Sequence, residues 1–323
     1  LCYFCTTIST HYNVNGRESA FMPHQIILTG DINLLGVKDP RVPFARVRQT
    51  LLAADLVISN FECCLYEPDR ERSIYEEGFY ADLAAGEALT DAGIGIIGNA
   101  NNVNFGGPAI RSSCARLDEL GIPHAGAGLD RKSAYASVIV ERDGTKYGFL
   151  QRSSVYWSHG GHEATAEFPG IAILEAHTAY KPRISETRTL TRPGHAPEII
   201  TWCEPDSLKT FCDDIAELRS SCDVLICSNH WGCDHDVLQY MEQAGHAAID
   251  AGADVVMGHG PHFPLGIEVY KNKPIFYSLG SFSFHTGHGA KKHPDWIGMM
   301  PILTGNSSGI VEARFALVRH NQK

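Results

Sequence analysis

The sequence has no excess of basic residues. It contains 27 Lys and Arg against 37 Asp and Glu, a formal net charge of -10 at pH 7. Surfaces that bind nucleic acid or anionic membranes carry clustered positive charge, so we expect neither partner. The acidic balance suits a metal or another cationic ligand, although it would also serve solubility alone.

Long apolar runs and a disulfide framework are missing too. No run of about 18 apolar residues occurs, and the N-terminus lacks a basic stretch followed by an apolar core, so we expect no membrane span and no signal peptide. The ten cysteines are scattered, several of them within apolar runs. This distribution is typical of buried free thiols in a reducing compartment and predicts a cytoplasmic protein.

Several well-known catalytic motifs are also lacking. The chain has neither the Gly-x-Ser-x-Gly elbow of serine hydrolases nor the P-loop of NTPases. Gly93–Gly98 matches Gly-x-Gly-x-x-Gly, but it lies within a predicted apolar strand and not between a strand and a helix, which argues against a dinucleotide site.

What the sequence does contain is an alternation of apolar strands and amphipathic helices. This order is typical of an α/β domain, and a composition of 44% hydrophobic and 20% charged residues provides a sizeable core. Residues 1–24 are polar and unpatterned, which predicts a loose N-terminal arm. We expect residues 25–318 to form a single domain, with a loop-rich insertion at about 152–197 where Gly, His, Pro, Thr and Tyr are frequent.

Polar residues with ligand chemistry follow five of the apolar runs. In open α/β sheets ligands bind at the carboxyl ends of the strands, where these residues would meet. Any one of them could be a turn former, a helix cap or an exposed strand end, but a shared position is typical of a metal site. We therefore predict one or two divalent ions (Mn, Zn, Fe or similar), bound by Asp31, Glu62, Asn101, His230, His259 and His262.

Other residues are candidates by type and place. Asn60 and Asn102 stand beside predicted ligands, and Arg152 and Tyr180 fall in the predicted insertion, so all four are expected to contact substrate. A packing or surface role fits Arg152 and Tyr180 equally well. Asp234 and His235 follow the His230 strand and are predicted to transfer protons.

The order of these motifs resembles one family. Thr29-Gly30-Asp31, Asn60-Phe61-Glu62, Ala100-Asn101-Asn102, His230-Trp231-Gly232, Gly252-Ala253-Asp254, Gly258 to His262, Ile267-Glu268 and Tyr277 to Gly280 stand in the order found in the CapA family of poly-γ-glutamate capsule synthesis. That family is related to calcineurin-like metallophosphoesterases. The resemblance, which covers residues 25–318, implies a four-layer α/β/β/α sandwich with metals at the strand ends.

The chain departs from the family pattern at three positions. The family usually has a histidine after the paired asparagines, where this chain has Val103. In related phosphoesterases a histidine there protonates the leaving group or binds the anion, so ordinary phosphatase activity is not expected. Gly260 replaces the second histidine of the family's His-His-Pro-His stretch, and Ser281 replaces an asparagine. The membrane anchor of many capsule members is also not seen, which makes polymer export a less expected role.

Three functions are compatible with these features. The leading hypothesis is a metal-dependent hydrolase that cleaves an amide bond in a peptide-like or carboxylate-bearing substrate. A metal that acidifies a Cα proton would instead make a peptide epimerase. A non-catalytic protein that binds an acidic polymer during capsule synthesis is the third hypothesis, and the shortage of basic residues argues against it.

Overall fold

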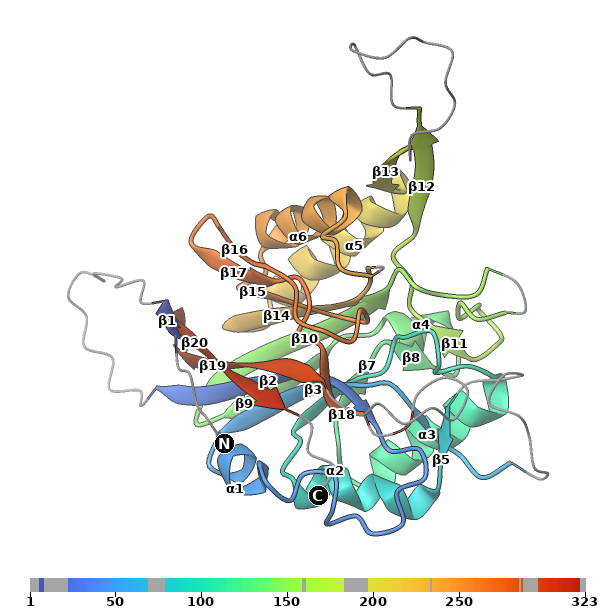
Figure 1. Cartoon of the computed structure of the whole chain (residues 1–323), viewed down its shortest axis with the longest axis vertical. Helices are drawn as coiled ribbons and strands as arrows, with labels where there is room; N and C mark the ends of the chain where they lie inside the picture. The colour runs from blue at the N-terminus through green and yellow to red at the C-terminus, as the bar shows by residue number, and fades with distance from the viewer. Residues whose placement is uncertain are drawn as a thin grey trace.

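The computed structural model describes residues 6–8, 23–68, 79–158, 161–182, 197–232, 234–284, 286 and 296–319. Two β-sheets lie face to face, and helices cover the outer side of each (Figure 1). The alternation of strands and helices along the chain therefore builds a four-layer sandwich, and the expected α/β/β/α architecture is confirmed.

The first sheet has eight strands. Its order is β1 (Thr6–Ile8), β20 (Gly309–Arg319), β19 (Ile297–Asn306), β2 (His24–Asn33), β3 (Leu56–Phe61), β6 (Ile96–Gly98) and β7 (His124–Ala125), and β18 (Ser281–Phe284) also pairs with β2. The neighbours β2, β3 and β6 are parallel, so their carboxyl ends share one edge.

The second sheet has six strands. Its order is β16 (Ile267–Tyr270), β17 (Lys273–Phe276), β15 (Val255–His259), β14 (Val224–His230), β10 (Thr145–Ser153) and β9 (Val138–Arg142). The strands β10, β14 and β15 are parallel, whereas β9 and β10 form the hairpin expected around Asp143-Gly144.

Alternation along each strand divides its residues between two cores. Leu28 and Ile58 of the first sheet pack against Phe149 and Ile226 of the second, and all four are fully buried between the sheets. Their strand neighbours face the opposite way, toward the helices. The inter-sheet core sets the distance between the two carboxyl edges.

The helices bury the outer faces. α1 (Arg48–Leu52), α2 (Glu87–Asp91) and α3 (Gly107–Glu119) cover the first sheet, and α5 (Pro205–Arg219) and α6 (Gln239–Ala251) cover the second (Figure 1). A 3-10 turn, Leu83–Gly86, precedes α2. α2 ends shortly before Gly93, which has a φ of +73°, and β6 begins only at Ile96, later than the strand predicted at Gly93–Gly98.

Shorter elements complete the domain. They are α4 (Arg131–Tyr135), the pairs β4 (Cys64–Leu65) with β5 (Tyr80–Ala81) and β8 (Ala127–Gly128) with β11 (Gly170–Ile171), and the hairpin of β12 (Ala176–Lys181) and β13 (Glu198–Cys203). That hairpin projects from the body at the top of Figure 1. Within the stretch predicted as a loop-rich insertion, the described residues thus form short strands. Residues 6–8 of the predicted arm pair with β20.

The described cysteines are free thiols, and all but Cys212 are buried. Burial raises the pKa of Cys63 and Cys227 to about 12, so these thiols act as small apolar side chains. None of the helices in the described ranges has the length and apolar character needed to cross a membrane.

Candidate metal centre

The carboxyl edges of the two sheets bring the predicted ligands together. In the first sheet Asp31 of β2 pairs in register with Asn60 of β3, and in the second His230 of β14 pairs with His259 of β15. These side chains lie on the inter-sheet faces, just beyond the buried apolar pairs. The convergence expected from strand ends is therefore present.

A β-bulge at Gly30 turns Asp31 into this site. Up to Thr29, the odd-numbered residues of β2 face the helices, but the register with β3 shifts between Thr29 and Asp31. The extra residue moves Asp31 to the other face. Gly30 has no room for a side chain, because a Cβ there would lie 1.7 Å from the carbonyl oxygen of Gly280.

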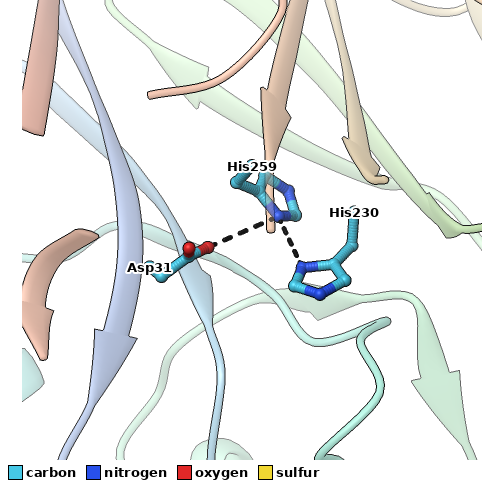
Figure 2. Close-up of side chains that lie close together, drawn as sticks. All are labelled: Asp31, His230 and His259. Carbon is cyan, nitrogen blue, oxygen red and sulfur yellow. Dashed lines mark hydrogen bonds and ion pairs between the residues drawn. The ribbon is translucent and has the colours of Figure 1, made fainter. Parts of the chain in front are cut away.

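Asp31, His230 and His259 form the first half of the centre (Figure 2). Their ligand atoms lie within 4.8 Å of one another, and all three side chains are buried. His259 Nδ1 is 3.6 Å from Asp31 Oδ1 and 3.0 Å from His230 Nδ1. Two imidazole nitrogens and a carboxylate at these separations match the ligand set of Zn or a similar ion.

Asp31, Glu62 and His262 form the second half, so Asp31 is shared. His262 Nδ1 lies 3.1 Å from Asp31 Oδ2, and its Nε2 lies 3.7 Å from Glu62 Oε1. His262 has a φ of +68° and a side chain that is 28% exposed, so the centre reaches solvent on its side. Two carboxylates and one imidazole suit a divalent cation.

Glu62 carries the clearest sign of a missing partner. Its side chain is fully buried, yet neither carboxylate oxygen has a hydrogen-bond partner. Buried polar groups are nearly always paired, and an unpaired buried carboxylate is costly. A cation between Glu62, Asp31 and His262 would supply the interaction, so the residues fit a metal.

Burial and charge set the protonation of the imidazoles. Burial lowers the pKa of His259 to about 3 and that of His230 well below its ordinary value, so both rings are neutral and can donate a lone pair to a cation. Burial also opposes the charged form of His262, but Glu62 and Asp31 outweigh it and raise its pKa to about 9.

The pKa values of the Asp31 and Glu62 carboxyl groups shift in opposite directions. Burial raises the pKa of both, and for Asp31 the hydrogen bond from His262 and the charge of that ring more than reverse this, so its pKa falls below the ordinary value. For Glu62 burial dominates, and its pKa lies well above the ordinary value. Asp31 therefore ionises more readily than Glu62.

The asparagines at the end of β6 have different tasks. The Asn101 NH₂ donates to Phe61 O at 2.9 Å, and its Oδ1 accepts from Asn104 N at 2.9 Å. Asn101, a predicted ligand, therefore uses its amide to stabilise the local turn. Asn102 Oδ1 instead lies 2.8 Å from His230 Nε2. Asn60 donates to Asp31 Oδ1 at 2.8 Å, which places it beside the centre as expected.

Two further polar residues, which the sequence analysis missed, contact His259. Its Nε2 is 3.0 Å from Gln151 Nε2 and 2.9 Å from Ser228 Oγ. Both are fully buried on inter-sheet faces of the second sheet. The available signal was the same as for the ligands, a polar residue at the end of an apolar strand.

The predicted substrate contacts Arg152 and Tyr180 are not brought to the centre. Arg152 follows Gln151 in β10 and so points to the opposite face, where it pairs with Asp214 of α5 and lines a cavity of about 450 Å³. Tyr180 is 69% exposed on the projecting β12–β13 hairpin.

The predicted proton-transfer residues lie on the surface. The side chains of Asp234 and His235 are 77% and 76% exposed, and His235 Nε2 is 3.4 Å from Asp234 Oδ1. The His235 ring stacks on Phe263 with centroids 3.9 Å apart. Phe263 follows His262 in the chain, so this pair lies near the centre without entering the buried cluster.

The three departures from the CapA pattern have structural counterparts. Val103 is 3% exposed and packs in the helix-side core of the first sheet. Gly260 has a φ of +116°, and a Cβ there would lie 2.7 Å from Trp231 O. Its N–H points to Asp31 Oδ2 at 3.4 Å. Ser281 Oγ is 3.4 Å from His262 Nδ1.

Comparison with known proteins agrees with this geometry. The chain is 28% identical to protein y4sH of Sinorhizobium fredii over 75% of its own length and 61% of that protein. It is 26% identical to the PGA biosynthesis protein CapA of Bacillus subtilis, over 76% and 57% of the two chains. It thus spans about three-fifths of the length of these relatives.

A solved structure shares the fold. It is described as a novel phosphatase from Mycoplasma pneumoniae, with a TM-score of 0.53 and 12% identity over 92% of this chain and 94% of that one. The model of the family described as "Bacterial capsule synthesis protein PGA_cap" matches residues 13–286. With its strand-end motifs in the same order, the chain belongs to this family of capsule synthesis proteins, the CapA family.

Proposed function

We propose that this protein is a divalent-metal-dependent hydrolase that cleaves an amide bond in a peptide-like or carboxylate-bearing substrate. The observation that carries the proposal is Glu62, whose buried carboxylate oxygens make no hydrogen bond although they lie beside Asp31 and His262. A protein keeps such a costly group where it binds a ligand.

The residues that would hold one or two cations are those of the two halves, Asp31, Glu62, His230, His259 and His262. A bound divalent cation would lower the pKa of a water molecule toward neutrality and polarise a substrate carbonyl. The side chains themselves supply two carboxylates and two neutral imidazoles in a buried site, where charge interactions are strong.

We expect substrate access and proton transfer on the exposed side of the centre. His262 is the ligand residue nearest to solvent, and Asp234 and His235 lie on the loop beside the Phe263 ring. A substrate that enters along His262 would therefore meet an imidazole and a carboxylate able to exchange protons with water. We propose these roles of His262, Asp234 and His235 from their positions.

The substrate class comes from chemistry and relatives together. Curated relatives include the PGA biosynthesis protein CapA of Bacillus subtilis and a probable polyglutamine synthesis accessory protein of Mycobacterium tuberculosis. Val103 supplies no imidazole at the position where the family usually has one, which disfavours phosphoester cleavage. A γ-glutamyl or peptide amide is thus the first substrate to test.

The decisive assay compares the metal-loaded protein with its metal-free form on γ-glutamyl peptides, ordinary peptides and a phosphoester. Release of an amine from an amide, dependent on the added cation, supports the proposal. Cation binding without turnover of any of the three substrates would refute it.

Val103 also favours a second candidate, the epimerase. Epimerisation at Cα expels no leaving group, so it does not need the missing imidazole. In deuterium oxide an epimerase would incorporate deuterium at Cα and leave the amide intact. Mass spectrometry of the same incubations separates the two functions.

A further inference from the structure

Gln151 fits closely between the two sheets. The side chain is fully buried at the end of β10. A Cβ at Gly98 would lie 2.5 Å from Gln151 Cδ, and one at Gly126 would lie 2.9 Å from Oε1. Gly98 of β6 and Gly126, between β7 and β8, thus leave space for this group, directly beside His259.

The orientation of the carboxamide follows from groups whose roles cannot change. The backbone N–H of Ala100 can only donate, and it lies 2.7 Å from Gln151 Oε1, which must be the oxygen. Gln151 Nε2 therefore donates to Asn60 Oδ1, 2.9 Å away, which leaves the Asn60 NH₂ to donate to Asp31 Oδ1.

Proton positions on the two imidazoles then follow. The second hydrogen of Gln151 Nε2 points at His259 Nε2 at 3.0 Å, so this nitrogen accepts and the ring carries its proton on Nδ1. That proton is donated to His230 Nδ1 at 3.0 Å. His230 therefore carries its own proton on Nε2 and donates to Asn102 Oδ1 at 2.8 Å.

This directional chain affects cation binding. His259 Nδ1 is the nitrogen that faces Asp31 and His230, and a cation there needs its lone pair. The ring must move its proton to Nε2, with no change of net charge. Ser228 Oγ, 2.9 Å from His259 Nε2, can then accept a hydrogen bond from Nε2–H, but the Gln151 NH₂ cannot.

We propose that Gln151 is a positioning residue that holds His259 in the tautomer unsuited to metal binding, and so weakens cation binding at the Asp31–His230–His259 half of the centre. The inference rests on the metal centre of the proposed function. In the metal-free protein, hydrogen bonds thus link Gln151, His259, His230 and Asn102, and a cation must break part of this chain in order to bind.

The test is a substitution of nearly equal shape. In Gln151→Glu one carboxylate oxygen still accepts from Ala100, and the other, which can no longer donate to Asn60 Oδ1, accepts from His259 Nε2–H. Carboxylate partners of metal-binding histidines typically change cation affinity by 10–100-fold. Calorimetric titration of the metal-free proteins with Zn²⁺ should therefore show binding about tenfold tighter in Gln151→Glu than in the unmodified protein.

Two further variants complete the experiment. Ser228→Ala removes the acceptor for the moved proton and should weaken binding about tenfold. Thr145→Val alters the other end of β10, where Thr145 is fully buried and its hydroxyl has no hydrogen-bond partner, so its affinity should match the unmodified protein. Equal or weaker binding by folded Gln151→Glu would overturn the proposal, since a merely structural role predicts loss.

A second readout needs no substitution. In ¹⁵N spectra of the metal-free protein, His259 Nε2 should have the shift of an unprotonated nitrogen and Nδ1 that of a protonated one. The reverse pattern would refute the tautomer. If the unmodified protein bound no Zn²⁺, the proposed function would fail, while these spectra would still decide the tautomer.

Discussion

The two sheets contribute different chemistry to one centre. The first sheet and the segments that follow its strands supply oxygen groups, namely Asp31, Asn60, Glu62 and Asn102, whereas the second supplies the imidazoles of His230, His259 and His262. Neither set alone resembles a transition-metal site of mixed ligands. The apolar core between the sheets therefore has a functional task, because it sets how closely oxygen and nitrogen ligands approach.

The largest expected effect comes from opening that core. Phe149→Ala removes a fully buried ring between the sheets and should cost about 3–5 kcal/mol of unfolding free energy. It should also weaken cation binding, because the two edges lose their spacing. Denaturant titration and calorimetry measure the two effects.

Phe211→Ala in α5 is the matched control. This ring is equally buried but packs on the helix side of the second sheet. A similar loss of stability with unchanged cation affinity is expected. If both variants weakened binding equally, the inter-sheet core would have no special role.

Removing a nitrogen ligand from the second sheet should have the next largest effect. His259→Ala should lower the affinity for cations by more than about 100-fold, the upper end for losing only a partner of a ligand. Metal analysis after dialysis measures the content directly. Full retention of metal by this variant would contradict the proposed ligand set.

Removing an oxygen ligand from the first sheet should separate function from stability. Glu62→Leu deletes the unpaired buried carboxyl group and should raise the stability of the metal-free protein by about 1–3 kcal/mol, while cation binding falls. Thermal unfolding with and without a chelator tests both parts. Loss of stability in the metal-free form would show that the contact of Glu62 with His262 outweighs the cost of burying its carboxyl group.

The smallest effect concerns the contact between the two sets of ligands. Because Glu62 and Asp31 raise the pKa of His262 to about 9, its protonated form stabilises the metal-free protein fully below its ordinary pKa, and this stabilisation disappears as the pH rises through 9. The unfolding temperature should fall by about 2–4 °C more in the unmodified protein than in His262→Gln between neutral pH and pH 10. Parallel curves would contradict the assignment.

Much of this arrangement follows from the sequence, because apolar strands that end in Asp, Glu or His must converge in an α/β sandwich. The layers and the Asp31, Glu62, His230, His259 and His262 cluster were predictable in this way. The turn of Asp31 toward the centre depends on the bulge at Gly30, which hydrophobic alternation does not reveal.

Other errors have local causes. Asn101 and Asn102 are the same residue type one position apart, and only the turn at Asn104 decides which amide faces His230. Arg152 was assigned to a loop, but β10 continues to Ser153, so alternation sends its side chain to α5.

The most direct test of the account is X-ray diffraction from crystals soaked in Mn²⁺, with anomalous differences recorded near the manganese edge. The account predicts an anomalous peak within ligand distance of Glu62, Asp31 and His262, with a second peak beside His230 and His259 if both halves are filled. An intact fold with no peak between these residues would contradict a metal centre at the joined edges of the two sheets.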